Sequence, residues 1–216
     1  MPSATIEEYL EAIYKLSEKG EVRPTHLADA LGVSGPTVTA TLRRLEAADL
    51  VSRPAGGVSL TDSGRTQALS IVRRHRLAER FLADVLELPW DLVHDEACTL
   101  EHALSPRVQE ALERYMDNPE VCPHGHPIPT ADLSIAELAG TPLAEHAAGE
   151  HVEVIRVAED DEQLLAYLAS HGLFPGAAVD VVDVSPFEGP FLLRVKDETF
   201  ALGRDIAGKV IVKSAA

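Results

Sequence analysis

The sequence predicts a mainly α-helical protein with a small amount of β structure: an N-terminal winged helix-turn-helix, a helical middle segment and a C-terminal β-barrel. Three observations favour this fold class. Apolar residues recur at helical spacing through most of the chain up to residue 117, two short strands with a glycine-rich turn interrupt them near residue 55, and short strands dominate after Val152. We therefore expect three domains, over 1–72, 73–140 and 151–216.

The N-terminal segment has the element order of a winged helix-turn-helix. Ile6, Leu10 and Ile13 lie on one face of a helix expected over 3–19, and Gly20 ends it. Ser34 is the expected N-cap of the last helix of the trio, with Pro36 close behind. The remaining elements of this segment are helices over 24–31 and 34–48 and strands over 50–54 and 58–60, the strands joined by a turn at Ala55-Gly56-Gly57.

This arrangement predicts contact with double-stranded DNA. The second helix of a helix-turn-helix enters the major groove, where its first residues reach the base edges. Small hydroxyl-bearing or apolar side chains suit bases, and arginines suit phosphates. The candidates for base contact are Ser34, Pro36, Thr37 and Thr39, and those for phosphate contact are Arg43, Arg44 and Arg53. A simple helix cap is the alternative interpretation of Ser34-Gly35-Pro36.

The charge distribution agrees with a DNA-binding N-terminal part. The net charge is −16, from 19 Lys and Arg against 35 Asp and Glu. Up to His75 there are 9 basic and 9 acidic residues, so the remainder carries 19 − 9 = 10 basic and 35 − 9 = 26 acidic residues. A neutral segment with clustered arginines suits DNA, and a carboxylate-rich segment suits cations or merely keeps the protein soluble.

The rest of the chain divides into helices, an irregular connection and strands. The expected helices cover 61–86, 89–104 and 106–117, and residues 118–150 are an irregular connection rich in Pro, Gly and His. The strands of the expected barrel cover 152–157, 178–184, 190–196, 198–202 and 208–212, with one helix over 160–171.

Six potential metal ligands lie on two successive helices. His75 and Glu79 are four residues apart and share a helix face. On the next helix, potential ligands follow one another at i, i+4, i+7 and i+8: His94, Cys98, Glu101 and His102. Imidazole, carboxylate and thiolate ligands together suit first-row transition metals better than Mg²⁺ or Ca²⁺. The alternative interpretation is a solvated charged face.

The sequence resembles the diphtheria toxin repressor family of iron- and manganese-dependent regulators. The segments that carry the resemblance are SGPTVTATLRRLE at 34–46, RRHRLAERFL at 73–82, HDEACTLEHALS at 94–105 and CPHGHPIP at 122–129. The resemblance covers essentially the whole chain. It implies a homodimer that binds an interrupted palindrome in DNA, a helical dimerisation domain with two metal sites, and an SH3-like C-terminal domain.

The resemblance also implies the two ligand sets. An ancillary site would use His75, Glu79 and His94. A primary, activating site would use the Cys98, Glu101 and His102 side chains together with Glu8 of the first helix, where many family members have methionine, and Glu11 follows one turn later. The two carboxylates favour Mn²⁺, whereas the thiolate favours Fe²⁺. We expect Mn²⁺, with Fe²⁺ as the alternative.

Helical geometry adds a hypothesis about switching. Glu8 and Glu11 lie roughly opposite the apolar stripe of the first helix, so their face is either solvated or free to meet a part of the protein outside the winged segment. A metal that joins Glu8 to the Cys98–His102 segment would tie the DNA-binding domain to the dimer domain, and DNA and metal would then strengthen each other's binding.

Two further groups of residues have weaker support as metal ligands. Asp160 and Gln163 match an acidic residue and a glutamine that family members can send to the ancillary metal, but an acidic helix start explains them equally well. Cys122, His124 and His126 resemble a zinc knuckle. Because the family carries CPHG as a structural loop, a metal role is not the expected one there.

The sequence also limits where the protein resides in the cell and which class of protein it belongs to. It contains no signal peptide pattern and no apolar run long enough for a membrane span, and two cysteines suit a reducing cytoplasm. We expect a cytoplasmic protein that is not an enzyme, because no H-E-x-x-H motif, nucleophile elbow or phosphate loop is present. Two alternatives stay open: a metalloenzyme that uses the same ligands, and a metal-independent winged-helix regulator.

Overall fold

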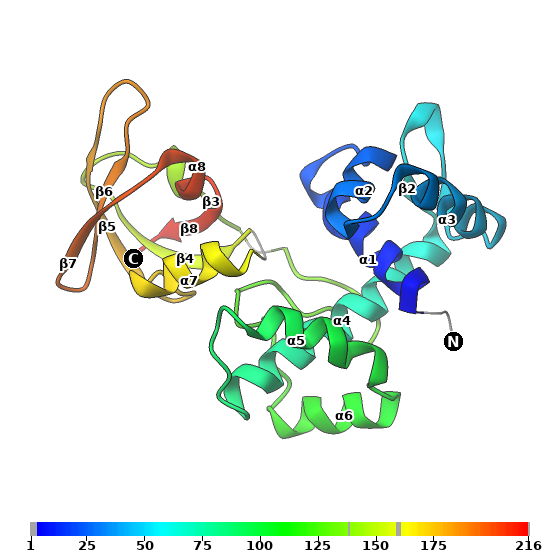
Figure 1. Ribbon diagram of the computed structural model, residues 1–216. Helices are drawn as coiled ribbons and strands as arrows, with labels where there is room; N and C mark the ends of the chain where they lie inside the picture. Colours follow the sequence, from blue (N-terminus) through cyan, green and yellow to red (C-terminus); the bar gives the residue numbers. More distant parts are fainter. Residues whose placement is uncertain (1–3, 138, 159–160, 216) are drawn as a thin grey trace. The chain divides into compact units, whose positions relative to one another are not determined.

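The computed structural model describes residues 4–137, 139–158 and 161–215, and they form two compact units (Figure 1). The first unit comprises residues 1–75 and 129–134, and the second comprises residues 76–128 and 135–216. One helix, α4 (Asp62–Asp84), runs through the division between them.

The first unit is a winged helix-turn-helix. It contains α1 (Ala4–Lys19), α2 (Pro24–Leu31) and α3 (Gly35–Ala47), followed by the antiparallel strands β1 (Val51–Ser52) and β2 (Ser59–Leu60). Gly32 ends α2 in the left-handed conformation with φ 62°, which glycine adopts without steric cost, and this makes the tight turn into α3. The apolar stripe of α1 packs against Leu27, Val38 and Leu42 in one core.

The wing is shorter than the sequence predicts. Strands over 50–54 and 58–60 were expected, but each strand has two residues, and Pro54–Gly56 forms a 3-10 turn between them. Pro54 has no N–H to donate to a strand ladder, so pairing stops before it. Ala55, inside the expected glycine turn, has a left-handed backbone with φ 41°.

The helical part of the second unit contains the end of α4, α5 (Val93–Leu100), the 3-10 turn Glu101–Ala103 and α6 (Pro106–Tyr115). A helix over 89–104 was expected, and both of its ends are wrong. Pro89-Trp90 lies in a turn closed by the Leu92 N–H and the Pro89 carbonyl, and the last residues tighten into 3-10 geometry. A small core of Ala78, Leu82, Val93, Ala97 and Leu104 joins α4 to α5.

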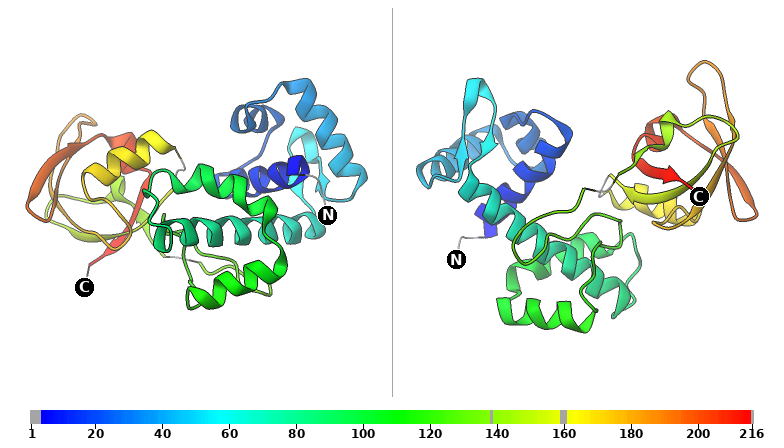
Figure 2. Two further views of the ribbon diagram at one scale, coloured as in Figure 1. Left: turned by 60° about the horizontal axis from the view of Figure 1, so that its bottom comes forward. Right: turned by 180° about the vertical axis from the view of Figure 1, so that it is seen from behind.

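The C-terminal part of the second unit is one curved antiparallel sheet with the strand order β3-β8-β4-β5-β6-β7 (Figures 1 and 2). The helix that follows β4 contributes Leu165 and Leu168 to the core of this sheet. Its elements are β3 (Thr141–Pro142), β4 (His151–Val157), α7 (Glu162–Ser170), β5 (Ala178–Val184), β6 (Phe191–Val195), β7 (Glu198–Leu202), α8 (Arg204–Ala207) and β8 (Val210–Ser214).

The connection expected to be irregular over 118–150 contains β3 and the 3-10 turn Leu143–Glu145. Two residues that pair only with a strand 70 positions later leave no local pattern, and for this reason periodicity missed them. The short helix α8 was also missed. No helix in the described ranges is both long and apolar enough to cross a bilayer.

Candidate metal centre and DNA-binding surface

Helix α4 carries two buried ionisable side chains one turn apart. His75 and Glu79 are each 2% exposed. Because α4 is continuous, the spacing of four residues places both on one face of the helix. A carboxylate this deeply buried is costly unless it is paired or binds a cation, so the groups around Glu79 decide what this face can do.

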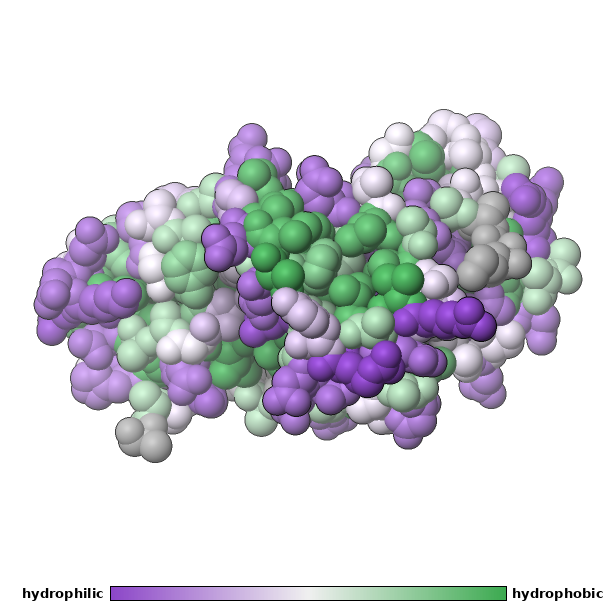
Figure 3. Space-filling view, turned by 90° about the horizontal axis from the view of Figure 1, so that it is seen from below, coloured by the Kyte–Doolittle hydropathy of each residue, from purple (hydrophilic) through white to green (hydrophobic). Residues whose placement is uncertain are grey.

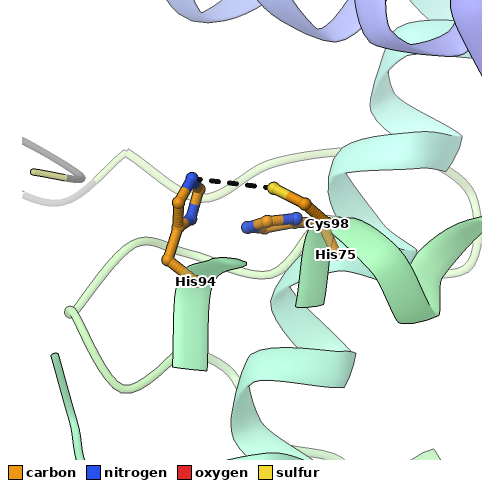
Figure 4. A group of neighbouring side chains, drawn as sticks. All are labelled: His75, His94 and Cys98. Atoms are coloured by element: carbon orange, nitrogen blue, oxygen red, sulfur yellow. Dashed lines mark hydrogen bonds between the residues drawn. The ribbon is translucent and has the colours of Figure 1, made fainter. Parts of the chain in front are cut away.

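Glu79 contacts histidines from two other segments. Its Oε1 atom lies 3.2 Å from Nδ1 of His94 on α5 and 3.3 Å from Nδ1 of His124 in the loop 122–126. On α5, Nε2 of His94 lies 3.8 Å from Sγ of Cys98. Ligand atoms of His75, His94 and Cys98 lie within 4.8 Å of one another, and their side chains converge from α4 and α5 (Figure 4).

Glu101 and His102 lie beyond the end of α5. They belong to the 3-10 turn Glu101–Ala103, and Glu101 itself still has α-helical dihedral angles. Glu101 is 1% exposed, and its Oε1 atom lies 3.5 Å from Nε2 of His102. Cys98 thus lies near His94, and Glu101 lies near His102. That these four residues form one ligand face stays a prediction.

The two carboxylates of α1 differ in their surroundings. Glu11 is buried, with Oε1 3.3 Å from Nζ of Lys15 and 3.9 Å from Nδ1 of His75. The Glu11 side chain is therefore not solvated but lies beside His75 of α4 within the first unit. Glu8 is exposed, and no group of three closely spaced potential ligands among the described residues includes it.

A third group of potential ligands joins α4 to the loop 122–126. Glu79, Cys122 and His124 are all buried, and their ligand atoms lie within 4.8 Å of one another. The loop that carries Cys122 and His124 is tight: the Cys122 N–H donates to the His126 carbonyl, and the Gly125 N–H donates to the Cys122 carbonyl. The spacing of Cys122 and His124 was the signal for this group in the sequence.

Gly125 is required in this loop. It has a left-handed φ of 86°, and a Cβ atom there would lie 2.0 Å from the Ile155 carbonyl oxygen. The loop backbone can therefore approach β4 only because residue 125 has no side chain.

The third group fits a thiophilic or borderline transition metal. Among the described residues, Nδ1 of His124 makes no hydrogen bond, although it is fully buried beside Glu79. Burial, and next the neighbouring Glu79 carboxylate, raise the pKa of the Cys122 thiol well above its usual value. The free protein therefore holds a neutral thiol here, and a metal that binds Cys122 as thiolate must displace its proton.

The predicted DNA-reading residues lie at the start of α3 and in the wing. Ser34, Pro36, Thr37, Arg43, Arg44 and Arg53 are exposed, and Thr39 is half-buried. Ser34 caps the helix, because its Oγ accepts from the Thr37 N–H, and its hydroxyl also contacts Oγ1 of Thr37 at 2.8 Å. Thr39 donates to the Gly35 carbonyl. The cap interpretation of Ser34 is thus correct, and the exposed surface remains available to DNA.

Comparisons with known proteins match every part of the chain. Residues 1–55 match the iron dependent repressor N-terminal DNA binding domain, residues 61–130 match the iron dependent repressor metal binding and dimerisation domain, and residues 141–214 match the FeoA domain. The iron-dependent repressor IdeR of Mycobacterium leprae is 37% identical over 97% of this chain and 96% of its own length. The chain belongs to the diphtheria toxin repressor family.

Other members of the diphtheria toxin repressor family agree with this assignment. The diphtheria toxin repressor of Corynebacterium diphtheriae is 34% identical over 83% of this chain and 84% of its own. A solved manganese-dependent transcriptional repressor in complex with manganese has a TM-score of 0.90 and 36% identity, over 97% of this chain and 100% of its own. The structure of ScaR with bound Cd²⁺ has a TM-score of 0.85 and 30% identity, over 99% of this chain and 100% of its own.

These relatives assign the class of function. The chain is a metal-dependent transcriptional repressor with a DNA-binding and a dimerisation domain, and the metalloenzyme alternative is wrong because its relatives are repressors rather than enzymes.

The ancillary role that the resemblance implied for Asp160 and Gln163 stays a prediction. Gln163 is exposed on α7, and Asp160 lies outside the described residues. The loop 122–126 places Cys122 and His124 beside Glu79.

Proposed function

We propose that this repressor binds DNA when Mn²⁺, or alternatively Fe²⁺, occupies a centre built around Glu79, and that it controls genes of metal homeostasis. The observation that carries the proposal is that Nδ1 atoms of two histidines, His94 and His124, both lie within 3.3 Å of one buried carboxylate oxygen. With the nearby thiols of Cys98 and Cys122, this donor set is one that first-row transition metals bind well.

Two groups of potential ligands adjoin Glu79, which lies 3.2 Å from His94. His75, His94 and Cys98 surround one position, and Cys122 and His124 surround the other. We retain Cys98, Glu101 and His102 as ligands of a separate activating site, completed by Glu8 or Glu11 of α1. The buried Glu11 beside His75 favours Glu11 for this role. A bound cation would neutralise carboxylates that otherwise repel one another, and so it would favour one arrangement of the DNA-binding domain.

We propose that α3 and the wing bind an interrupted palindrome, with each half-site read by one subunit. The exposed Pro36 and Thr37 would contact bases, and the exposed arginines Arg43, Arg44 and Arg53 would contact phosphates. Two identical half-sites separated by one helical turn of DNA, or a multiple of it, are the geometric consequence of a symmetric dimer.

The apolar surface of the helical part supports the dimer. Leu86, Leu92, Val108 and Tyr115 are exposed there, and they lie in the segment that matches the dimerisation domain. Val108 and Tyr115 are seven residues apart on α6, a helix without a buried residue. Figure 3 shows a broad hydrophobic area on one face of the protein. Apolar surface of this kind is normally covered in a stable assembly.

The experiment that tests the proposal is DNA binding by the metal-free full-length protein, titrated anaerobically with Mn²⁺, Fe²⁺, Zn²⁺ and Mg²⁺ in turn. Mn²⁺ and Fe²⁺ should restore binding at micromolar concentration, and Mg²⁺ should not, because it avoids nitrogen and sulfur ligands. DNA binding that is equally tight without metal would instead favour a metal-independent regulator.

Glu8→Met tests the choice between the two ions. If Glu8 sets the preference, this variant should lose activation by Mn²⁺ and keep activation by Fe²⁺, since a thioether is a softer ligand than a carboxylate. Glu11→Gln is the matched variant on the same helix. Unchanged responses of Glu8→Met to both ions would show that Glu8 belongs to a solvated face.

A further inference from the structure

Trp90, the only tryptophan of the chain, is bonded to the loop 122–126 in two ways. Its indole N–H donates to the Pro123 carbonyl at 2.9 Å, and its own backbone carbonyl lies 2.9 Å from Nε2 of His124. The indole also packs against the His124 ring, with ring centroids 5.0 Å apart. One residue in the turn before α5 thus fixes both the backbone of the loop and the orientation of the histidine.

The second of these bonds determines which nitrogen of His124 can bind a metal. A carbonyl oxygen only accepts hydrogen bonds, so Nε2 of His124 must carry the hydrogen. In the neutral ring Nδ1 then has the free lone pair, and Nδ1 is the atom that is fully buried, lies 3.3 Å from Glu79 and makes no hydrogen bond among the described residues. The ring is therefore held with its ligating nitrogen directed at the Glu79 carboxylate.

The same residues join the loop to the C-terminal sheet within the second unit. The Val157 N–H of β4 donates to the His124 carbonyl at 3.0 Å, and Nε2 of His126 lies 2.9 Å from the Val157 carbonyl. On its other side, Trp90 meets the Phe174 ring edge-on, with centroids 5.1 Å apart. The sheet supplies none of the three ligands Glu79, Cys122 and His124, but it holds the loop that supplies two of them.

We infer that Trp90 is a positioning residue that sets His124 to bind metal through Nδ1 and connects this ligand to the C-terminal sheet. The inference rests on the proposed metal site at Glu79, Cys122 and His124. Hydrogen-bond partners behind a metal-ligating histidine fix its tautomer and orientation, and their loss commonly weakens metal binding about 10- to 100-fold. Trp90 acts through the Pro123 carbonyl and through packing, because its backbone carbonyl persists in any variant.

Co²⁺ binding to the full-length protein tests the inference. A cobalt–thiolate absorption band that is retained in Cys98→Ser and lost in Cys122→Ser reports this site alone. In Trp90→Phe the Co²⁺ concentration at half-saturation of that band should rise about tenfold, with the same band at saturation. Tyr167→Phe, which removes a comparable side-chain bond to the Ala201 carbonyl on the same sheet, is the matched control and should change nothing.

A second variant separates positioning from folding. Replacement of Trp90 by benzothienylalanine keeps the shape of the ring and removes only its N–H, so it should weaken Co²⁺ binding even if Trp90→Phe folds poorly. In the wild type, Trp90 fluorescence should be quenched by Co²⁺ with the same midpoint as the band. NMR of the zinc-loaded protein should show His124 bound through Nδ1 with hydrogen on Nε2.

Three results would overturn the inference. The first is that Trp90→Phe and the benzothienyl protein bind Co²⁺ as tightly as the wild type and lose only thermal stability. The second is that zinc binds His124 through Nε2. The third, a wild-type protein without any Cys122-dependent band, would also remove this site from the proposed function, whereas the first two leave that function intact.

Discussion

At the scale of single residues, Glu79 is the point where the candidate ligand groups meet. Its carboxylate lies beside His94 and His124, and it is 2% exposed. Helical spacing predicted that His75 and Glu79 share one face, and the family resemblance added His94 to them. The sequence could not predict His124, which reaches Glu79 through a loop more than 40 residues away, a contact that depends on tertiary packing.

Glu79→Gln should weaken metal activation of DNA binding by about tenfold or more, because the amide keeps the size of the side chain and loses the negative charge that a cation requires. The measurement is the Mn²⁺ dose response of DNA binding. Glu96→Gln, an exposed position on α5, is the control and should behave like the wild type. Equal dose responses for all three proteins would remove Glu79 from the metal centre.

Cys122 leads to a prediction about pH. Burial raises the pKa of this thiol above its reference value of 9.0, so the folded protein keeps the proton that the unfolded chain loses above that pH. The contribution of this thiol to the free energy of unfolding is therefore fully present below about pH 9, and it declines as the pH rises towards the folded-state pKa. Metal-free wild type should lose free energy of unfolding between pH 8 and pH 10 in denaturant titrations.

Cys122→Ser should show a smaller decline than the wild type over the same pH range, since a hydroxyl does not ionise there. Cys98→Ser, which removes the exposed cysteine, serves as the control and should decline like the wild type. A decline in Cys122→Ser as steep as that of the wild type would show that other groups cause it.

At the scale of elements, the sequence predicted most helices and strands but not how some of them begin and end. α2 and β7 match their expected ranges, and Pro24 and Gly32 are the local signals that bound α2. The wing and α5 were predicted too long, since Pro54 and Pro89 interrupt them. The loop 122–126 was expected to be structural, and its contact with Glu79 was not predicted, because burial decides whether a cysteine and a histidine meet a carboxylate.

Two substitutions on α3 should separate sequence-specific recognition from general affinity for DNA. Thr37→Ala should change the preferred operator sequence, because Thr37 is exposed at the start of the helix. Arg43→Ala should weaken binding to operator and random DNA alike and reduce the slope of affinity against salt by about one. The measurement is binding to both DNAs at several salt concentrations. Equal effects of the two substitutions on both DNAs would remove the recognition role from this helix.

At the scale of the whole molecule, the three-part architecture and the membership of the family were predictable from sequence, because each part carries its own pattern. The quaternary structure was predictable only through the family resemblance. Exposed apolar residues on a helix can be recognised as unusual only when the fold shows that nothing covers them, as for Val108 and Tyr115, which are 46% and 71% exposed.

Val108→Asp should shift the protein from dimer to monomer, because a charge in an apolar interface loses its hydration without gaining a partner. Sedimentation at micromolar protein concentration measures the change, and DNA binding should fall with it, since a monomer contacts one half-site. The control is Phe187→Asp, at a fully exposed tip of the C-terminal sheet, which should remain dimeric. A dimeric Val108→Asp protein would place the interface elsewhere.

The central claim is that metal binding and DNA binding are coupled in this protein, and the most direct test measures that coupling from both sides. The affinity for Mn²⁺ is determined by calorimetry or by competition with a chelator, with and without operator DNA, and the affinity for the operator is determined with and without Mn²⁺. Linkage requires the two factors to be equal. We predict that the operator tightens Mn²⁺ binding by the same factor, at least tenfold, by which Mn²⁺ tightens operator binding. A Mn²⁺ affinity that operator DNA leaves unchanged would contradict the account.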